Sequence, residues 1–115
     1  MLSLVEKSLD DDKAIDVKVI DLRNKTAIAD YMVIATGTSP RHLATMAEHL
    51  IRTIKSEGHG TAPVEGQSQG DWVLVDAGDV IVHLFRAEVR TFYNLERLWE
   101  ISEPGATQTV NHTTA

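Results

Sequence analysis

The clearest pattern of apolar and polar positions lies within residues 71–99, and it predicts a β-hairpin followed by a helix. Two short runs, 72–75 and 80–85, are rich in β-branched and aromatic residues, as strands are. The segment Asp76-Ala77-Gly78-Asp79 between them has the composition of a turn. A loop of two or four residues predicts the cross-strand pairs Trp72 with His83, Leu74 with Ile81, and Asp76 with Asp79.

With this register the two faces of the hairpin differ in chemistry, because side chains alternate along a strand. One face is aliphatic and is expected to lie under helices: Val73, Val75, Val80, Val82 and Leu84. The other face is apolar at its centre and acidic at its turn end: Trp72, Leu74, Asp76, Asp79, Ile81, His83 and Phe85. Such a face is typical of a surface that a partner covers. The alternative is that Trp72 and Phe85 pack under another segment of the same chain.

The choice of turn is itself open. A three-residue loop closed by Gly78 would shift the register by one residue and mix the two sets of side chains. Ala77 adopts positive φ poorly, which counts against the tight two-residue turn. The clean separation of aliphatic side chains favours the register given above.

The rest of the chain alternates between helical and strand patterns. Ser39 is suited to an N-cap, Pro40 to the first helical position and Gly58 to a left-handed terminator, so a long helix is predicted between them. Residues 31–35 are continuously apolar, as in a central strand covered on both faces. Further predicted elements are an amphipathic helix over 1–12 that stops or frays at the acidic run 10–12, a strand over 15–22, a polar connection over 23–30, an edge strand at 61–64 interrupted by Pro63, and a closing helix over 87–101.

This order, α-β-β-α-β-β-β-α, predicts an α/β fold with α+β character. Adjacent strands twice follow each other without a helix between them, which indicates a mixed sheet with flanking helices, mainly on one side. We expect a single domain over 1–102. Residues 103–115 are mostly polar and are predicted to be a disordered tail.

Composition narrows the functional classes. The 115 residues carry 11 Lys and Arg against 17 Asp and Glu, a net charge of −6. This argues against unaided nucleic-acid binding and favours a basic partner. The absence of cysteine excludes disulfides and thiolate chemistry. No apolar run approaches the roughly 20 residues that span a bilayer, and the N-terminus lacks the features of a secretory signal, so a cytoplasmic location is expected.

Candidate catalytic or ligand-binding patterns are few. Thr36-Gly37-Thr38-Ser39 precedes a helix but lacks the spacing of a phosphate-binding loop, and helix entry explains it. Asp76 and Asp79 could form a metal-binding pair, yet they straddle a turn where Asp is favoured for its own hydrogen bonds. His42 and His49 lie two helical turns apart, about 10 Å along the axis, too far for one ion. No catalytic, cofactor-binding or metal residue is predicted.

Two blocks of the sequence resemble a known family. DYMVIATGTSPRHLATMAEHL and DWVLVDAGDVIVHLFRAEVRTFYNLERLW are similar to the Iojap-like ribosomal silencing factor family over about residues 1–101. The resemblance implies a nucleotidyltransferase-like fold without enzymatic activity and without a cofactor. It also implies binding to the large ribosomal subunit, at its ribosomal protein number fourteen on the intersubunit face. Occupation of that site blocks joining of the small subunit and represses translation when nutrients are scarce.

The resemblance also suggests where this contact lies. Trp72 matches the family tryptophan implicated in ribosome binding, on the strand that also holds Leu74. The face argument extends the predicted partner-binding surface, which comprises Trp72, Leu74, Asp76, Asp79, Ile81 and His83. One departure is Ala77, where many relatives have an aromatic residue; if that ring contributes to the contact or supports the turn, the affinity or the hairpin register differs here.

Two other hypotheses come from different functional classes. The first is a metal-dependent nucleotidyltransferase-type enzyme that uses Asp76 and Asp79. The second is a homodimer formed through the exposed face or edge of the sheet, in competition with the ribosome.

Overall fold

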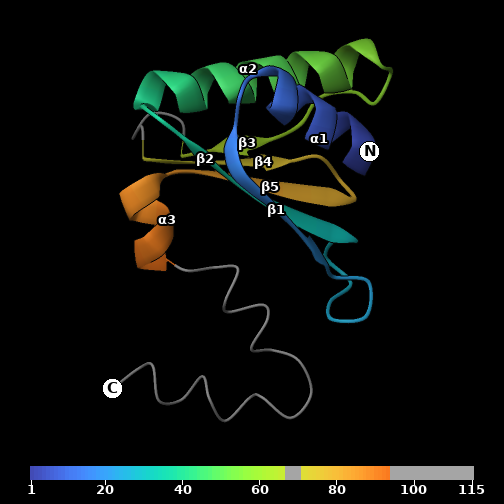
Figure 1. Ribbon diagram of the computed structural model, residues 1–115. Helices are drawn as coiled ribbons and strands as arrows, with labels where there is room; N and C mark the ends of the chain where they lie inside the picture. Colours follow the sequence, from blue (N-terminus) through green and yellow to red (C-terminus); the bar gives the residue numbers. More distant parts are fainter. Residues whose placement is uncertain (67–70, 94–115) are drawn as a thin grey trace, which may run out of the picture.

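The described part of the chain folds into a five-stranded mixed sheet with two helices on one face and one on the other (Figure 1). A computed structural model describes residues 1–66 and 71–93, and the order of its elements agrees with the predicted α-β-β-α-β-β-β-α. The strand order is β1-β2-β5-β4-β3; β2 and β5 are parallel and the other neighbours are antiparallel. Figure 1 shows α1 and α2 on one side of the sheet and α3 on the other. The mixed-sheet prediction is therefore confirmed.

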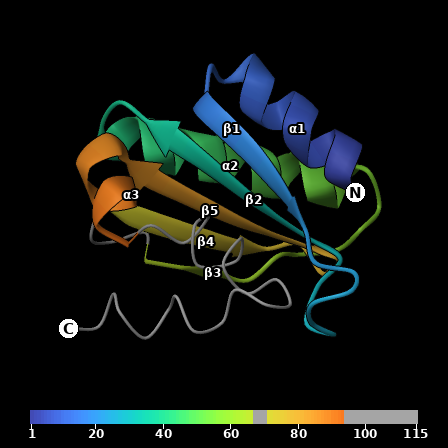
Figure 2. The same ribbon diagram turned by 60° about the horizontal axis from the view of Figure 1, so that its bottom comes forward.

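The first half of the chain contains α1 (Leu2–Asp11), β1 (Ile15–Asp21), β2 (Tyr31–Gly37) and α2 (Pro40–Ser56). The second half contains β3 (Val64–Glu65), β4 (Trp72–Asp76), β5 (Val80–Arg86) and α3 (Ala87–Tyr93). Figure 2 shows β1 as the outer strand beside β2, at the opposite edge of the sheet from β3. The predicted edge position of this strand is confirmed, but its predicted bounds, 61–64, are wrong: β3 begins only after Pro63 and shares Val64 alone with that range. The predicted extension of α3 to residue 101, the domain limit at 102 and the tail 103–115 lie outside the described residues.

The ends of α2 follow from its sequence. The side chain of Ser39 accepts a hydrogen bond from the backbone N–H of His42 at 3.0 Å, and Pro40 is the first helical residue. At the other end Gly58 has φ +84°, its N–H donates to the carbonyl of Lys55, and the N–H of His59 donates to the carbonyl of Ile54. These two bonds form a Schellman motif, so Gly58 ends the helix as predicted.

A larger core cluster lies between the sheet and the helices α1 and α2. The aliphatic face of the hairpin is buried there as predicted, with Val5 and Leu9 of α1 and Leu43, Met46 and Leu50 of α2 packed on the same cluster. A smaller cluster on the opposite face contains Ile20, Leu22, Ala29, Met32, Ile34 and Phe85, with Trp72, Ile81 and Val89 packed against it. The sheet thus separates a fully covered face from one that is covered only in part.

Two polar contacts join distant segments. The guanidinium of Arg90 in α3 donates from Nη1 to the carbonyl of Asp16 at 2.6 Å and to Oγ1 of Thr36 at 2.9 Å. Asp16 has φ +50° and lies at a register shift between β1 and β2. A side chain of α3 therefore stabilises a bulge in the outer strand.

Candidate functional site: the exposed face of the hairpin

The β4–β5 turn is built around Gly78. The N–H of Ala77 donates to the carbonyl of Val80 at 2.9 Å, which leaves Gly78 and Asp79 as the two central residues. Gly78 has φ +83°, and the first central position of a type II′ turn requires such an angle. The N–H of Gly78 also donates to Oδ1 of Asp76 at 2.9 Å, so Asp76 has the turn role that its position suggested.

This turn corrects the predicted register. Trp72 lies opposite Phe85, Leu74 opposite His83 and Asp76 opposite Ile81, so each partner is two residues further along β5 than predicted. The predicted pairing needed Ala77 at positive φ, whereas the observed turn gives that conformation to glycine. A displacement of two residues keeps every side chain on its face. The predicted division into two faces is therefore right although the cross-strand pairs are wrong.

Three stacked rings occupy the open face of the hairpin. The centroids of Trp72 and Phe85 are 6.2 Å apart, those of Trp72 and His83 6.1 Å, and those of His83 and Phe85 5.9 Å, with interplanar angles of 14° or less. Nε1–H of Trp72 donates to Nδ1 of His83 at 3.1 Å. The indole is thus held by stacking and by a hydrogen bond.

The six predicted partner-binding residues share this face but differ in exposure. Trp72, Leu74 and Ile81 are half-buried, whereas Asp76 and Asp79 at the turn are exposed. His83 is only 7% exposed and Phe85 only 1%. Burial lowers the pKa of His83 to about 4, so its imidazole is neutral near pH 7. Phe85 and His83 are buried in the monomer, as the second interpretation expects for Phe85, while Trp72, Leu74 and Ile81 keep a surface open to solvent.

Two features that the sequence did not reveal fix the backbone of Trp72. The guanidinium of Arg86 donates from Nε to Oδ1 of Asp71 at 2.9 Å, and the N–H of Arg86 donates to the carbonyl of Asp71. The hydrogen bond to Asp71 raises the pKa of Arg86. On the other side, a Cβ on Gly66 would lie 2.4 Å from the carbonyl oxygen of Trp72. Asp71 and Arg86 face each other in the observed register, so a correct turn assignment would have predicted their pairing.

The other polar patterns have structural explanations. Nδ1 of His42 accepts from the N–H of Thr38 at 2.9 Å, so its Nε2–H donates to the carbonyl of Asp12 at 2.7 Å. Nδ1 of His49 lies 2.8 Å from the carboxylate of the same Asp12. The two histidines thus connect α2 to the end of α1. Among residues 1–66 and 71–90, no group of three His, Asp or Glu side chains could hold a metal ion.

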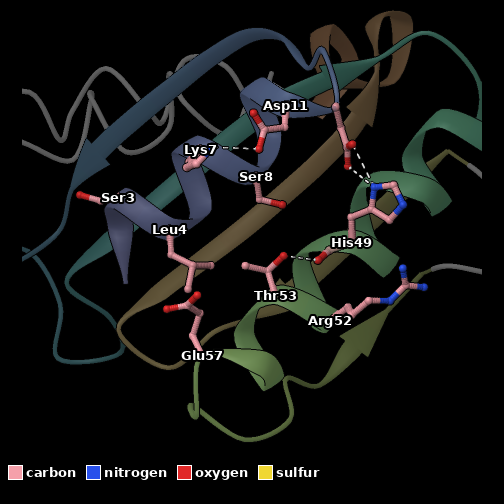
Figure 3. Close-up of a pocket in the computed structure, with 10 residues that line it drawn as sticks. Ser3, Leu4, Lys7, Ser8, Asp11, His49, Arg52, Thr53 and Glu57 are labelled. Atoms are coloured by element: carbon pink, nitrogen blue, oxygen red, sulfur yellow. Dashed lines mark hydrogen bonds and ion pairs between the residues drawn. The ribbon is translucent and has the colours of Figure 1, made fainter.

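A groove of about 500 Å³ lies between α1 and α2, on the helix-covered side of the sheet. Figure 3 shows Leu4 and Ser8 of α1 on one wall and His49 and Thr53 of α2 on the other. Two ion pairs lie in the groove: Lys7 with Asp11 at 3.2 Å and His49 with Asp12 at 2.8 Å. The groove is separate from the hairpin face, and the pair of His49 with Asp12 joins α2 to the end of α1, whereas the pair of Lys7 with Asp11 lies within α1. No helix within 1–66 and 71–93 combines the length and apolar character needed to cross a membrane.

The fold and its open face define the class of this protein: a small α+β domain whose central hairpin presents a partly exposed tryptophan and an acidic edge. Residues 1–115 match the family described as "Ribosomal silencing factor during starvation". The chain belongs to this family, and ribosomal silencing with repression of translation is its functional class. The predicted family resemblance is therefore confirmed.

Individual relatives agree with this assignment. The chain is 54% identical over 99 residues to the ribosomal silencing factor RsfS of Zymomonas mobilis, covering 86% of this chain and 74% of that protein. It is 33% identical over 103 residues to the mouse protein named "Mitochondrial assembly of ribosomal large subunit protein 1", covering 87% of this chain and 45% of that one. A crystal structure of a protein from Chromobacterium violaceum superposes with a TM-score of 0.82 at 36% identity, covering 86% of this chain and 82% of the other. The Zymomonas mobilis and mouse relatives are thus named for a silencing role and an assembly role.

Proposed function

We propose that this protein binds the large ribosomal subunit at its ribosomal protein number fourteen and thereby prevents the small subunit from joining. Membership in the ribosomal silencing family supports the link to ribosomes, and the name of the mouse relative supports the choice of the large subunit. A contact on the intersubunit face would silence translation by steric exclusion alone. The proposal places the protein in the cytoplasm and assigns it no catalytic step.

The observation that carries the proposal is the composition of the open hairpin face. Trp72, Leu74 and Ile81 form an apolar patch, and the exposed carboxylates of Asp76 and Asp79 lie at its turn end. A partly exposed tryptophan with adjacent aliphatic side chains is typical of the anchor of a protein interface. The acidic edge complements a basic ribosomal protein and would speed its encounter with this face.

The decisive variant is Trp72→Ala. Loss of an anchoring tryptophan commonly costs about 2 kcal/mol or more, roughly a 30-fold rise in Kd. We expect the purified variant to remain folded but to fail to co-sediment with large subunits. In a light-scattering assay of subunit joining, the wild-type protein should inhibit association and the variant should not.

The matched control is Ile15→Ala. Ile15 is an apolar side chain with 41% exposure on the outer strand β1, away from the hairpin. This variant should co-sediment as the wild type does. Undiminished binding by Trp72→Ala would show that the contact lies elsewhere on the molecule.

A homodimer is the second candidate, and the outer strand favours it. β1 is seven residues long, lies at an edge of the sheet and exposes Ile15 and Val17 at 41% and 40%. Long apolar edge strands invite pairing with another chain. Light scattering over a range of protein concentrations should show a dimer that Val17→Lys disrupts if this edge mediates it. A dimer disrupted by Trp72→Ala instead would place it on the ribosome-binding face.

A further inference from the structure

His83 holds the anchoring tryptophan from within the sheet. Its side chain lies on the same face as Trp72, in the adjacent strand and two residue pairs along the ladder, because Trp72 pairs with Phe85 and Leu74 pairs with His83. With 7% of its surface exposed, His83 offers a partner almost no area for contact. Its position therefore suits a role that acts through the indole.

The stack and the hydrogen bond constrain the indole in different ways. The rings of Phe85 and His83 are nearly parallel to the indole, at 14° and 13°, so they fix its plane. Stacking alone would also accept the flipped indole, which lies in the same plane but has Nε1 on the opposite side. The hydrogen bond from Nε1–H to Nδ1 of His83 distinguishes the two orientations, because only one of them brings the donor to the acceptor.

The hydrogen bond also defines the state of His83. Nδ1 accepts, so the imidazole is neutral and carries its proton on Nε2. Phe85 has no acceptor, and Leu74 and Ile81 have none either. Among the described side chains of this patch, His83 is the one whose acceptor distinguishes the two orientations of the indole.

We infer that His83 is a positioning residue for ribosome binding: it orients the indole of Trp72 before the partner arrives and does not itself form the contact. This inference rests on the proposed function of the hairpin face. Ordering a mobile side chain during association costs affinity, and a side chain that is already ordered avoids this loss. His83 thus contributes to affinity through preorganisation.

The first test uses the unmodified protein. The indole N–H groups of Trp72 and Trp99 give separate signals in a ¹⁵N-edited NMR spectrum, and the signal that disappears in Trp72→Phe belongs to Trp72. We expect the Trp72 indole proton to exchange with solvent much more slowly than that of free tryptophan. Exchange at the rate of free tryptophan would overturn the inference, whatever the behaviour of any variant.

The second test compares two substitutions of His83. His83→Asn places a carboxamide oxygen near the position of Nδ1, whereas His83→Leu is apolar and has no acceptor. We expect His83→Leu to raise the Kd for large subunits about threefold to tenfold, and His83→Asn to stay within about twofold of the wild type. Slow exchange of the indole proton should be lost in the first variant and restored in the second.

A double-mutant cycle separates positioning from a general loss of stability. Trp72→Phe retains a stacked ring but lacks the N–H donor, so in this background His83→Leu should change the Kd by less than about twofold. Equal effects of His83→Leu in both backgrounds would overturn the inference. The outcome for the proposed function is distinct: if Trp72→Ala abolishes binding while His83→Leu binds as the wild type does, the contact surface stands and the positioning role is wrong.

Discussion

Gly66 lies directly against the backbone of Trp72. Gly66 has φ +82°, and a Cβ at this position would lie 2.4 Å from the carbonyl oxygen of Trp72 and 3.3 Å from its Cε3 atom. Real Cβ atoms do not approach backbone atoms so closely, and the carbonyl belongs to the β4 ladder, which cannot move freely. Gly66 therefore allows the residue that follows β3 to lie close to the start of β4.

This contact predicts a large effect of Gly66→Ala on stability. Positive φ alone costs an alanine roughly 1–2 kcal/mol, and the collision with Trp72 should add about 1–3 kcal/mol. Urea unfolding measures the sum. The matched control is Gly60→Ala, because Gly60 also has φ +82° but a Cβ there would meet nothing within 4 Å. An equal loss of unfolding free energy in the two variants would mean that the backbone at Gly66 shifts without cost.

The β4–β5 hairpin shows which features of a fold its sequence can determine. The alternation of apolar residues assigned every side chain of the hairpin to its correct face, since burial depends on a period of two. It could not fix the cross-strand pairs, because a displacement by two residues leaves that alternation unchanged. The pairs were decided by Gly78, which takes the first central position of the turn, where positive φ is needed.

Contacts between distant segments were beyond a sequence argument for a different reason. The pairing of His49 with Asp12, and of Arg90 with the bulge at Asp16, depends on how helices lie on the sheet. Neither pattern has a local signature, whereas the ends of α2 were predictable because capping is a short-range effect. Likewise, the buried position of His83 depends on packing around the hairpin that alternation alone does not describe.

The burial of His83 predicts a specific loss of stability in acid. Its pKa is about 4 in the folded state and near 6.5 when the chain is unfolded, so between these values the unfolded state binds more protons. The free energy of unfolding should therefore fall as the pH is lowered from 6.5 to 4, by about 2–3 kcal/mol in total, and be fully present above pH 6.5. Thermal or urea unfolding across this window measures it.

The control for this acid effect is His83→Leu. All other ionisable groups are the same in the two proteins, so the difference between the two pH profiles isolates His83. The variant should show a shallower decline between pH 6.5 and 4. Parallel profiles would mean that His83 titrates normally in the folded protein.

The hydrogen bonds of Arg90 connect α3 to the outer strand, and we expect their loss to destabilise the protein. Its guanidinium donates to the carbonyl of Asp16 and to Oγ1 of Thr36, a residue only 5% exposed. In Arg90→Gln these acceptors lose a charged donor, and the free energy of unfolding should drop by about 1–3 kcal/mol. Hydrogen exchange should show faster opening of β1 near Asp16. Arg41→Gln, at an exposed site on α2, should unfold as the wild type does, and equal stability of the two variants would exclude a structural role for Arg90.

The acidic edge of the hairpin should affect the rate of association with the partner more than the affinity for it. Asp79 is exposed at the second central position of the turn, where its backbone carbonyl accepts from the N–H groups of Asp30 and Tyr31. Asp79→Asn keeps this backbone geometry and removes one negative charge, so the fold should be unchanged. The association rate with large subunits should fall about twofold to fivefold at low salt, and the difference should shrink as added salt screens the charge. Stopped-flow measurements at two ionic strengths would show this. The control is Asp10→Asn, at an exposed position on α1, because it removes the same charge at a site away from the turn. If both variants slow association equally, the protein's overall charge attracts the ribosome, and the turn has no particular part in it.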